Sequence, residues 1–170
     1  MRVRKATHDD VGAVHSIYEP IVRETAISFE EQVPDLAEIA ERIEKSIVWF
    51  VCEDEGGVTG YGHAAPVRQP SAYRWSVEVT VYVHPHHRRR GVGHLLLQAL
   101  ITDLQKRGFV NVFAAIALPN DASVGLFESF NFRRVGSMNR VGYKLGEWRD
   151  VGWWQLRLDE PTVPPTEPRF

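Results

Sequence analysis

The sequence predicts a domain of the α/β or α+β class, in which helices cover the faces of a sheet. Three observations lead to this class. Some segments repeat apolar residues at helical spacing, whereas others alternate apolar and polar residues as strands do. The chain has 170 residues, which suits one domain of ordinary size. Hydrophobic residues make up 44% of it and charged residues 25%, which excludes disordered, collagen-like and coiled-coil proteins.

The N-terminal part is predicted to form an edge strand and then a helix. Residues 3–6 have the length of a short strand. Thr7 is an N-cap residue followed by acidic residues, whose charges suit the first turn of a helix. Pro20 is expected to kink or end this helix, because proline has no N–H to donate. The apolar face of the helix consists of Val11, Val14, Tyr18, Ile21 and Val22.

A second helix and a β-hairpin are expected next. Asp35 and Glu38 have the spacing of a capping box, and the apolar residues that follow repeat at helical spacing. Residues 48–53 are apolar and β-branched, as a buried strand is. Residues 54–57 contain two glycines and predict a turn, after which residues 58–66 form the returning strand.

The second half of the chain alternates strands and helices. Residues 75–83 predict a strong strand, because valines there alternate with Glu78, Thr80 and Tyr82. Helices are predicted at 95–107 and 122–130, and strands at 110–118, 132–137 and 150–158. We therefore expect residues 1–158 to form a single domain. Residues 159–170 hold four prolines and few apolar side chains, which predicts a solvated tail.

Charge and cysteine content exclude several classes of protein. The 20 basic and 22 acidic residues lack the basic excess of chains that coat nucleic acid or anionic membranes. No apolar run approaches the roughly 20 residues of a membrane span, and the N-terminus has no signal-peptide pattern, so a cytoplasmic location is expected. Cys52 cannot close an intrachain disulfide alone, and its apolar surroundings predict a buried, inert thiol.

The segment from Arg88 to Gly93 carries the clearest functional signal. It has the pattern Arg88-x-x-Gly91-x-Gly93 between a strand and a helix. A helix N-terminus leaves backbone N–H groups free for an anion, and glycines let a phosphate approach the backbone. This pattern indicates a pyrophosphate site, although a glycine-rich turn beside a solvated basic run has the same spacing. A Walker loop and a dinucleotide fingerprint are excluded, since no Lys-Ser/Thr follows and Leu96 replaces the third glycine.

With this motif the chain resembles the GNAT superfamily of acyl-CoA-dependent N-acetyltransferases. The family motif Gln/Arg-x-x-Gly-x-Gly/Ala is matched by Arg88 to Gly93, and Asn120 stands where the family has an Asn that opens a helix. The resemblance covers residues 3–158. It implies a mixed, mostly antiparallel central sheet flanked by about four helices. It also implies a splay between the strand ending at Val83 and the strand starting near Val110, and acetyl-CoA as co-substrate.

Three further segments resemble the phosphinothricin acetyltransferase branch of this family. They are residues 76–83, 118–124 and 142–152. The branch implies acetylation of the α-amine of small amino acids and their analogues, such as phosphinothricin or methionine sulfoximine. It also implies a homodimer, with residues 142–148 near the active site of the partner subunit.

Glu78 is the predicted general base. An amine must be neutral to attack a thioester, so a group is needed to accept its proton. Glu78 is a carboxylate within a valine-rich strand that leads to the phosphate loop, and it matches the Glu that serves as base in the resembling branch. The alternative is a solvent-facing residue of a half-exposed strand.

The resemblance also predicts the residues that bind acetyl-CoA. They are Val81, Tyr82, Val83, Arg88, Arg89, Arg90, Gly91, Val92, Gly93, His94 and Asn120. Backbone groups at the end of the strand would bind the pantetheine amides and polarise the acetyl carbonyl. One residue departs from the family pattern. Phe127 occupies the position of a Tyr or His that protonates the leaving thiolate, and phenylalanine has no proton to give.

The predicted acceptor site consists of Arg74, Trp75 and Ser76. An amino acid presents a carboxylate, which a guanidinium binds through two hydrogen bonds. Arg68 is an alternative, but Arg74 is preferred because alternate strand residues share a face, which would align it with Glu78. Phe29 and the tryptophans at 148, 153 and 154 are expected to pack in the core.

No metal site is predicted. His84, His86, His87 and His94 form a polar cluster, but their spacing is not that of known metal sites, and no Cys or Asp joins them. His63 is expected to be a half-buried strand residue.

Three other functions stay open at this point. The acceptor of an acetyl group could be another small amine, such as a polyamine or aminoglycoside, or a protein N-terminus. The chain could instead be a non-catalytic acyl-CoA sensor, which Phe127 favours and Glu78 opposes. A weaker alternative is a nucleotide-binding protein without acyl transfer.

Overall fold

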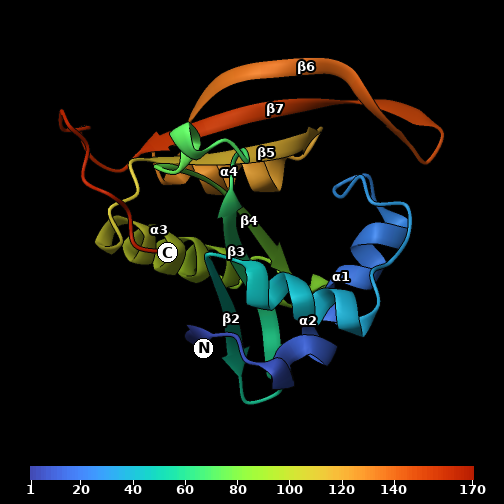
Figure 1. Ribbon diagram of the computed structural model, residues 1–170. Helices are drawn as coiled ribbons and strands as arrows, with labels where there is room; N and C mark the ends of the chain where they lie inside the picture. The colour runs from blue at the N-terminus through green and yellow to red at the C-terminus, as the bar shows by residue number, and fades with distance from the viewer.

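A seven-stranded sheet in the order β1-β2-β3-β4-β5-β7-β6 organises the computed structural model, which describes residues 1–170 (Figure 1). The strands are β1 (Arg2–Lys5), β2 (Val48–Asp54), β3 (Gly57–Pro66), β4 (Ser76–Val83), β5 (Asn111–Leu118), β6 (Arg133–Lys144) and β7 (Glu147–Arg157). The helices are α1 (Val11–Glu24), α2 (Leu36–Lys45), α3 (Val92–Lys106) and α4 (Asp121–Ser129). Short 3₁₀ turns are η1 (His8–Asp10), η2 (Ser71–Tyr73) and η3 (Pro85–His87). No helix is both long and apolar enough to cross a membrane.

The two faces of β4 lie in different cores, as the alternation of its residues predicts. Val77 and Val79 belong to a buried cluster with apolar residues of α3. Tyr82 packs against the second cluster, which α1 and α2 form with Trp49, Val51 and other strand residues. The helices therefore cover both faces of the sheet, α3 on one and α1 with α2 on the other (Figure 1).

The pairing of β4 with β5 is the only parallel pairing in the sheet, and it is short. It joins Ser76, Val77 and Glu78 to residues 111–113 and goes no further. Beyond this point β5 continues beside β7, while β4 continues beside β3. The expected mostly antiparallel sheet with a splay between β4 and β5 is therefore confirmed.

Local sequence signals predict some helix limits closely and others not: α2 and α4 begin where expected or within one residue, whereas α3 begins at Val92, three residues before its predicted start. Asp35 and Glu38 form the predicted capping box: the Glu38 N–H donates to Asp35 Oδ1 at 2.8 Å, and the Asp35 N–H to Glu38 Oε2 at 2.9 Å. Of the two effects expected of Pro20, ending the helix is wrong, because α1 continues to Glu24; a kink at Pro20 stays a prediction. Residues after Pro20 are buried in the core, and this packing sustains the last turn.

The C-terminal hairpin of β6 and β7 is longer than the sequence predicted. Its turn contains Leu145 and Gly146, both at positive φ. The expectation that Trp148 lies in the core is wrong, because its exposed fraction is 61%, whereas Trp154 is buried. No helix covers the strands near Trp148, and alternation along a strand does not show which face is covered.

Lys144 joins the hairpin to the loop between α1 and α2. Its buried Nζ donates to the carbonyl oxygens of Val22 and Ser28, at 2.7 Å each. Beside it, the ring of Phe29 lies where Gly142 has no side chain, so that any Cβ there would meet the ring. These contacts hold the end of the hairpin over the face of the sheet that carries Tyr82. The expectation that Phe29 packs in the core is wrong, because this residue is exposed at the edge of the hairpin.

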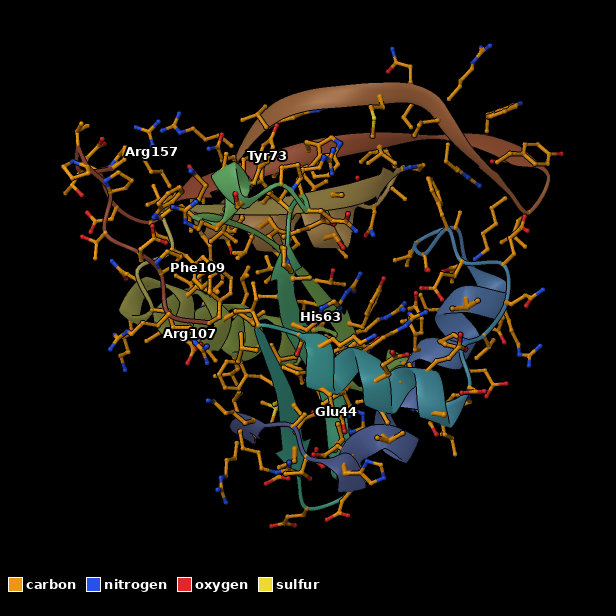
Figure 2. All side chains as sticks on the ribbon, viewed as in Figure 1. Glu44, His63, Tyr73, Arg107, Phe109 and Arg157 are labelled. Atoms are coloured by element: carbon orange, nitrogen blue, oxygen red, sulfur yellow. The ribbon has the colours of Figure 1, made fainter.

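The C-terminal segment 159–170 is exposed except for Pro168, but several contacts tie its end to the protein. Glu167 accepts two hydrogen bonds from Arg74, each 2.6 Å long, and the indole of Trp75 donates to the carbonyl of Thr166. Figure 2 shows Phe109, whose ring meets that of Phe170. These partners are distant in sequence, so composition alone did not reveal them. The division into a domain of residues 1–158 and a tail stays a prediction.

Candidate active site

A cavity of about 710 Å³ lies at the N-terminus of α3, beside the end of β4. This volume is within the roughly 300–1,000 Å³ of small-molecule sites. The residues predicted to bind acetyl-CoA line it, with the exception of Arg90: Val81, Tyr82, Val83, Arg88, Arg89, Gly91, Val92, Gly93, His94 and Asn120. The structure thus brings these residues together, while their role in binding stays a prediction.

The loop before α3 is shaped to receive an anion. Arg89 and Gly91 both adopt positive φ, which turns the chain into the helix. The N–H of Leu95 makes the first intrahelical bond, to the Gly91 carbonyl. The backbone N–H groups of the three preceding residues therefore have no partner within the helix and remain free to bind phosphate. The arginines of this loop make no ion pair within the protein, so they remain available to an anion.

The opposite wall of this cavity comes from α4. Asn120 caps this helix, since its Oδ1 accepts a hydrogen bond from the N–H of Ser123. Phe127 does not line the cavity. It is buried against Phe132, with ring centres 5.1 Å apart, so neither its chemistry nor its position supplies a proton to a leaving thiolate.

A second cavity of about 460 Å³ lies between α2 and the strands β2, β3 and β4. Trp49, His63 and Thr80 are among its lining residues. Tyr82 lines this cavity and the first one as well. The two cavities therefore meet at β4, one on the side of the phosphate loop and the other under α2.

Glu78 lies on β4 four residues before Tyr82 and lines neither cavity itself. It is the last residue of β4 that pairs with β5, and it shares a face with Thr80 and Tyr82. Its partner on β3 is Ala65, which lines the second cavity. Burial raises the pKa of Glu78, and the nearby charge of Arg68 opposes this increase. A carboxylate in this environment holds a proton more readily than an exposed one, as a general base requires.

The predicted wall of Arg74, Ser76 and Glu78 is not formed. Arg74 precedes the strand, its guanidinium lies 3.9 Å from the centre of the Trp75 ring, and it is paired with Glu167. The alignment of Arg74 with Glu78 was wrong because β4 begins only at Ser76. Neither Arg74 nor Trp75 lines either cavity. Ser76 shares the face of Glu78, and the roles of all three in acceptor binding stay predictions.

Arg68 is the guanidinium whose charge acts on Glu78. It lies 5.9 Å from the ring centre of Trp153 on β7, across the splay. Its guanidinium donates to the carbonyl of Val67 and makes no ion pair. The geometry therefore favours Arg68 over Arg74 as a partner for an acceptor carboxylate.

Sequence reasoning missed the aromatic residues of the second cavity. Trp49 stacks on His63 with ring centres 4.3 Å apart, and burial lowers the pKa of His63 to about 4. These residues come from separate strands, so no local spacing links them.

The histidines near the phosphate loop interact among themselves: the Nδ1 atom of His84 accepts from the N–H of His86. No group of three or more metal-ligating side chains is present.

Comparison with known proteins identifies the family. The acetyltransferase (GNAT) family model matches residues 13–132. Phosphinothricin N-acetyltransferase of Streptomyces viridochromogenes is 38% identical, over 96% of this chain and 91% of that protein. The L-methionine sulfoximine/L-methionine sulfone acetyltransferase of Salmonella typhimurium is 35% identical, over 96% of this chain and 98% of that protein.

Solved structures agree with this result. The crystal structure of a GNAT superfamily phosphinothricin acetyltransferase from Sinorhizobium meliloti, in complex with AcCoA, has a TM-score of 0.92. Its identity is 32%, and the match covers 99% of this chain and 92% of that one. The predicted resemblance and the predicted enzyme class, an acyl-CoA-dependent N-acetyltransferase, are confirmed. The chain belongs to the acetyltransferase (GNAT) family, and phosphinothricin N-acetyltransferases are among its relatives.

Proposed function

We propose that this protein transfers the acetyl group of acetyl-CoA to the α-amine of a small amino acid or amino-acid analogue. One observation carries the proposal: β4 and β5 separate after Glu78, whose partner Ala65 lines the second cavity, and the two cavities share Tyr82 further along the same strand. The names of the relatives, which include a phosphinothricin and a methionine sulfone acetyltransferase, support the choice of acceptor.

The first cavity is the proposed binding site of acetyl-CoA, which supplies an acetyl group activated as a thioester. The N–H groups of Val92, Gly93 and His94 would hold the pyrophosphate, with the adjacent arginines adding positive charge. The backbone of Val81 to Val83 would bind the pantetheine arm, since β4 has no partner strand on the β5 side there.

Glu78 acts as the proposed general base. An amino acid presents an ammonium group at neutral pH, and this group must lose a proton before its nitrogen can attack. Burial raises the pKa of Glu78, which brings its proton affinity closer to that of the amine. Arg68 would hold the acceptor carboxylate, since it is the cation whose charge acts on Glu78.

A second candidate function is a non-catalytic sensor of acyl-CoA. The observation in its favour is Phe127, which replaces a proton donor with a buried hydrocarbon ring. A sensor would bind CoA without releasing thiol, so a thiol-release assay with acetyl-CoA and a panel of amino acids separates the two functions.

The proposal includes a homodimer and a cytoplasmic location. Large apolar side chains are exposed along the C-terminal hairpin, and they are Val135, Met138, Val141, Tyr143, Leu145 and Trp148. A row of exposed apolar groups of this kind is typical of a surface that another subunit covers.

The cytoplasmic location follows from the proposed use of acetyl-CoA, a substrate of intracellular metabolism.

Gly93→Asp should weaken CoA binding roughly tenfold or more, because the new carboxylate would repel the pyrophosphate at the helix N-terminus. Isothermal titration with CoA measures the change. Gly12→Asp is the matched control, since Gly12 is also the second residue of its helix, α1. Equal CoA affinity in Gly93→Asp and the wild type would remove the phosphate-loop assignment.

Glu78→Gln should lower kcat by about 100-fold or more at neutral pH and leave the KM for acetyl-CoA nearly unchanged. The wild-type rate should rise with pH as Glu78 loses its proton, above the usual range for a glutamate, because burial raises its pKa. In the variant, the part of this rise that comes from Glu78 should disappear. The variant's rate should increase only at high pH, where more of the amine is neutral, so its deficit relative to the wild type should shrink there. Thiol-release rates against pH test this, with Glu55→Gln in the exposed β2–β3 turn as control. A wild-type rate in Glu78→Gln would exclude Glu78 as the base.

Arg68→Ala should raise the KM for an amino-acid acceptor about tenfold or more, because a charge-assisted pair is lost. It should hardly affect a primary amine that lacks the carboxylate. Arg74→Ala should leave both KM values alone and lower the melting temperature, since it releases Glu167. If only Arg74→Ala raises the KM for the amino-acid acceptor, then Arg74 and not Arg68 binds the acceptor carboxylate.

Analytical ultracentrifugation should find the wild type as a dimer and Trp148→Arg as a monomer, because a buried charge at the proposed interface is costly. Val163→Arg, at an exposed apolar residue of the C-terminal segment, should leave the dimer intact. A monomeric wild type at micromolar concentration contradicts the proposed assembly.

A further inference from the structure

The cavity under α2 contains a hydrogen-bond donor without a partner. Trp49 lines this cavity, is 6% exposed, and its indole Nε1 has no acceptor within the protein. Buried N–H groups are almost always paired, so an orphaned one calls for an explanation. A ligand that brings an acceptor into the cavity would supply the missing partner.

Stacking fixes the indole in place. Its ring lies on His63 at 4.3 Å and on Tyr61 at 5.2 Å, with interplanar angles of 13° and 18°. All three side chains lie on the face of the sheet that α2 covers, where Figure 2 shows His63. A rotation of the indole would break both stacks, so the donor is oriented in advance of binding.

The cavity has no unpaired charge for an ionic side chain. Arg42 makes two hydrogen bonds to the carboxylate of Glu30, at 2.7 and 3.2 Å. Lys45 is paired in the same way with Glu41. His63 is neutral at physiological pH, because burial lowers its pKa to about 4. A phosphinate or an ammonium group would therefore enter this cavity without a free counter-charge.

We propose that Trp49 determines acceptor specificity: the cavity takes the acceptor's side chain, and Nε1 donates to an uncharged oxygen on it, such as that of a sulfone. This inference rests on the proposed acetyl transfer. Its position is consistent with that reaction, since the cavity is bounded by Thr80 and Tyr82 and by Ala65, the partner of Glu78. An acceptor whose amine is near Glu78 would extend its side chain toward Trp49.

The test compares acceptors that differ at the end of the side chain. The wild type should acetylate methionine sulfone with a higher kcat/KM than either norleucine, which has no oxygen, or phosphinothricin, which carries a negative charge. Trp49→Phe keeps an aromatic ring and removes the donor. It should lower kcat/KM for methionine sulfone about tenfold relative to norleucine, the effect of one lost hydrogen bond, and leave the KM for acetyl-CoA unchanged.

Trp154→Phe is the matched control. Trp154 is buried on the opposite face of the sheet, and its Nε1 already donates to Glu128, so the ratio of the two rates should not change. The inference is overturned if Trp49→Phe lowers both rates equally or neither, or if phosphinothricin is the better acceptor of the wild type.

A failure of the proposed function has a different signature. If no amino acid releases thiol from acetyl-CoA, acetyl transfer to amino acids is wrong. Calorimetric titration of methionine sulfone into the protein with CoA still decides the role of Trp49. Binding that Trp49→Phe weakens supports the pocket, and absence of binding to the wild type overturns it.

Discussion

The short parallel pairing of β4 with β5 is the constraint on which the rest of the site depends. Three residue pairs hold the strands together, and β4 then has no neighbour on that side. Unpaired backbone groups are costly when they are buried, so a ligand with amide groups is a natural partner for the free edge. Glu78 is the last paired residue. The fold thereby brings a carboxylate to the point where the strand becomes available to a ligand.

Both faces and both ends of β4 contribute to the arrangement. Valines on one face anchor the strand on α3, which fixes the phosphate loop at the start of that helix. The other face presents Glu78, Thr80 and Tyr82 toward the side that α1 and α2 cover. Strand alternation thus places the anchoring valines Val77 and Val79 on one face and Glu78 on the other, and the two cavities share Tyr82.

Contacts between residues distant in sequence attach the C-terminal hairpin and the C-terminal segment to the rest of the protein. The buried ammonium group of Lys144 satisfies two carbonyls of the segment that includes the α1–α2 loop, so it ties the C-terminal hairpin to the N-terminal half of the chain. The ion pair of Arg74 with Glu167 does the same for the C-terminal segment. Arg74, which the sequence suggested would bind the acceptor, is thereby occupied away from both cavities.

The sequence alone determined the features that depend on neighbours along the chain. Capping boxes, alternation and the Arg88–Gly93 pattern are local, and so most strands, the starts of α2 and α4, the glycine loop before α3 and the place of Glu78 on its strand were predictable. The tertiary structure decided which distant groups meet. Trp49, His63 and Thr80 come from three strands, and Arg68 lies near Glu78 through the loop after β3. Pairing of side chains across strands depends on sheet order and register, which local spacing does not encode. For the same reason only the fold revealed that Trp148 is exposed and that Arg74 is paired with Glu167.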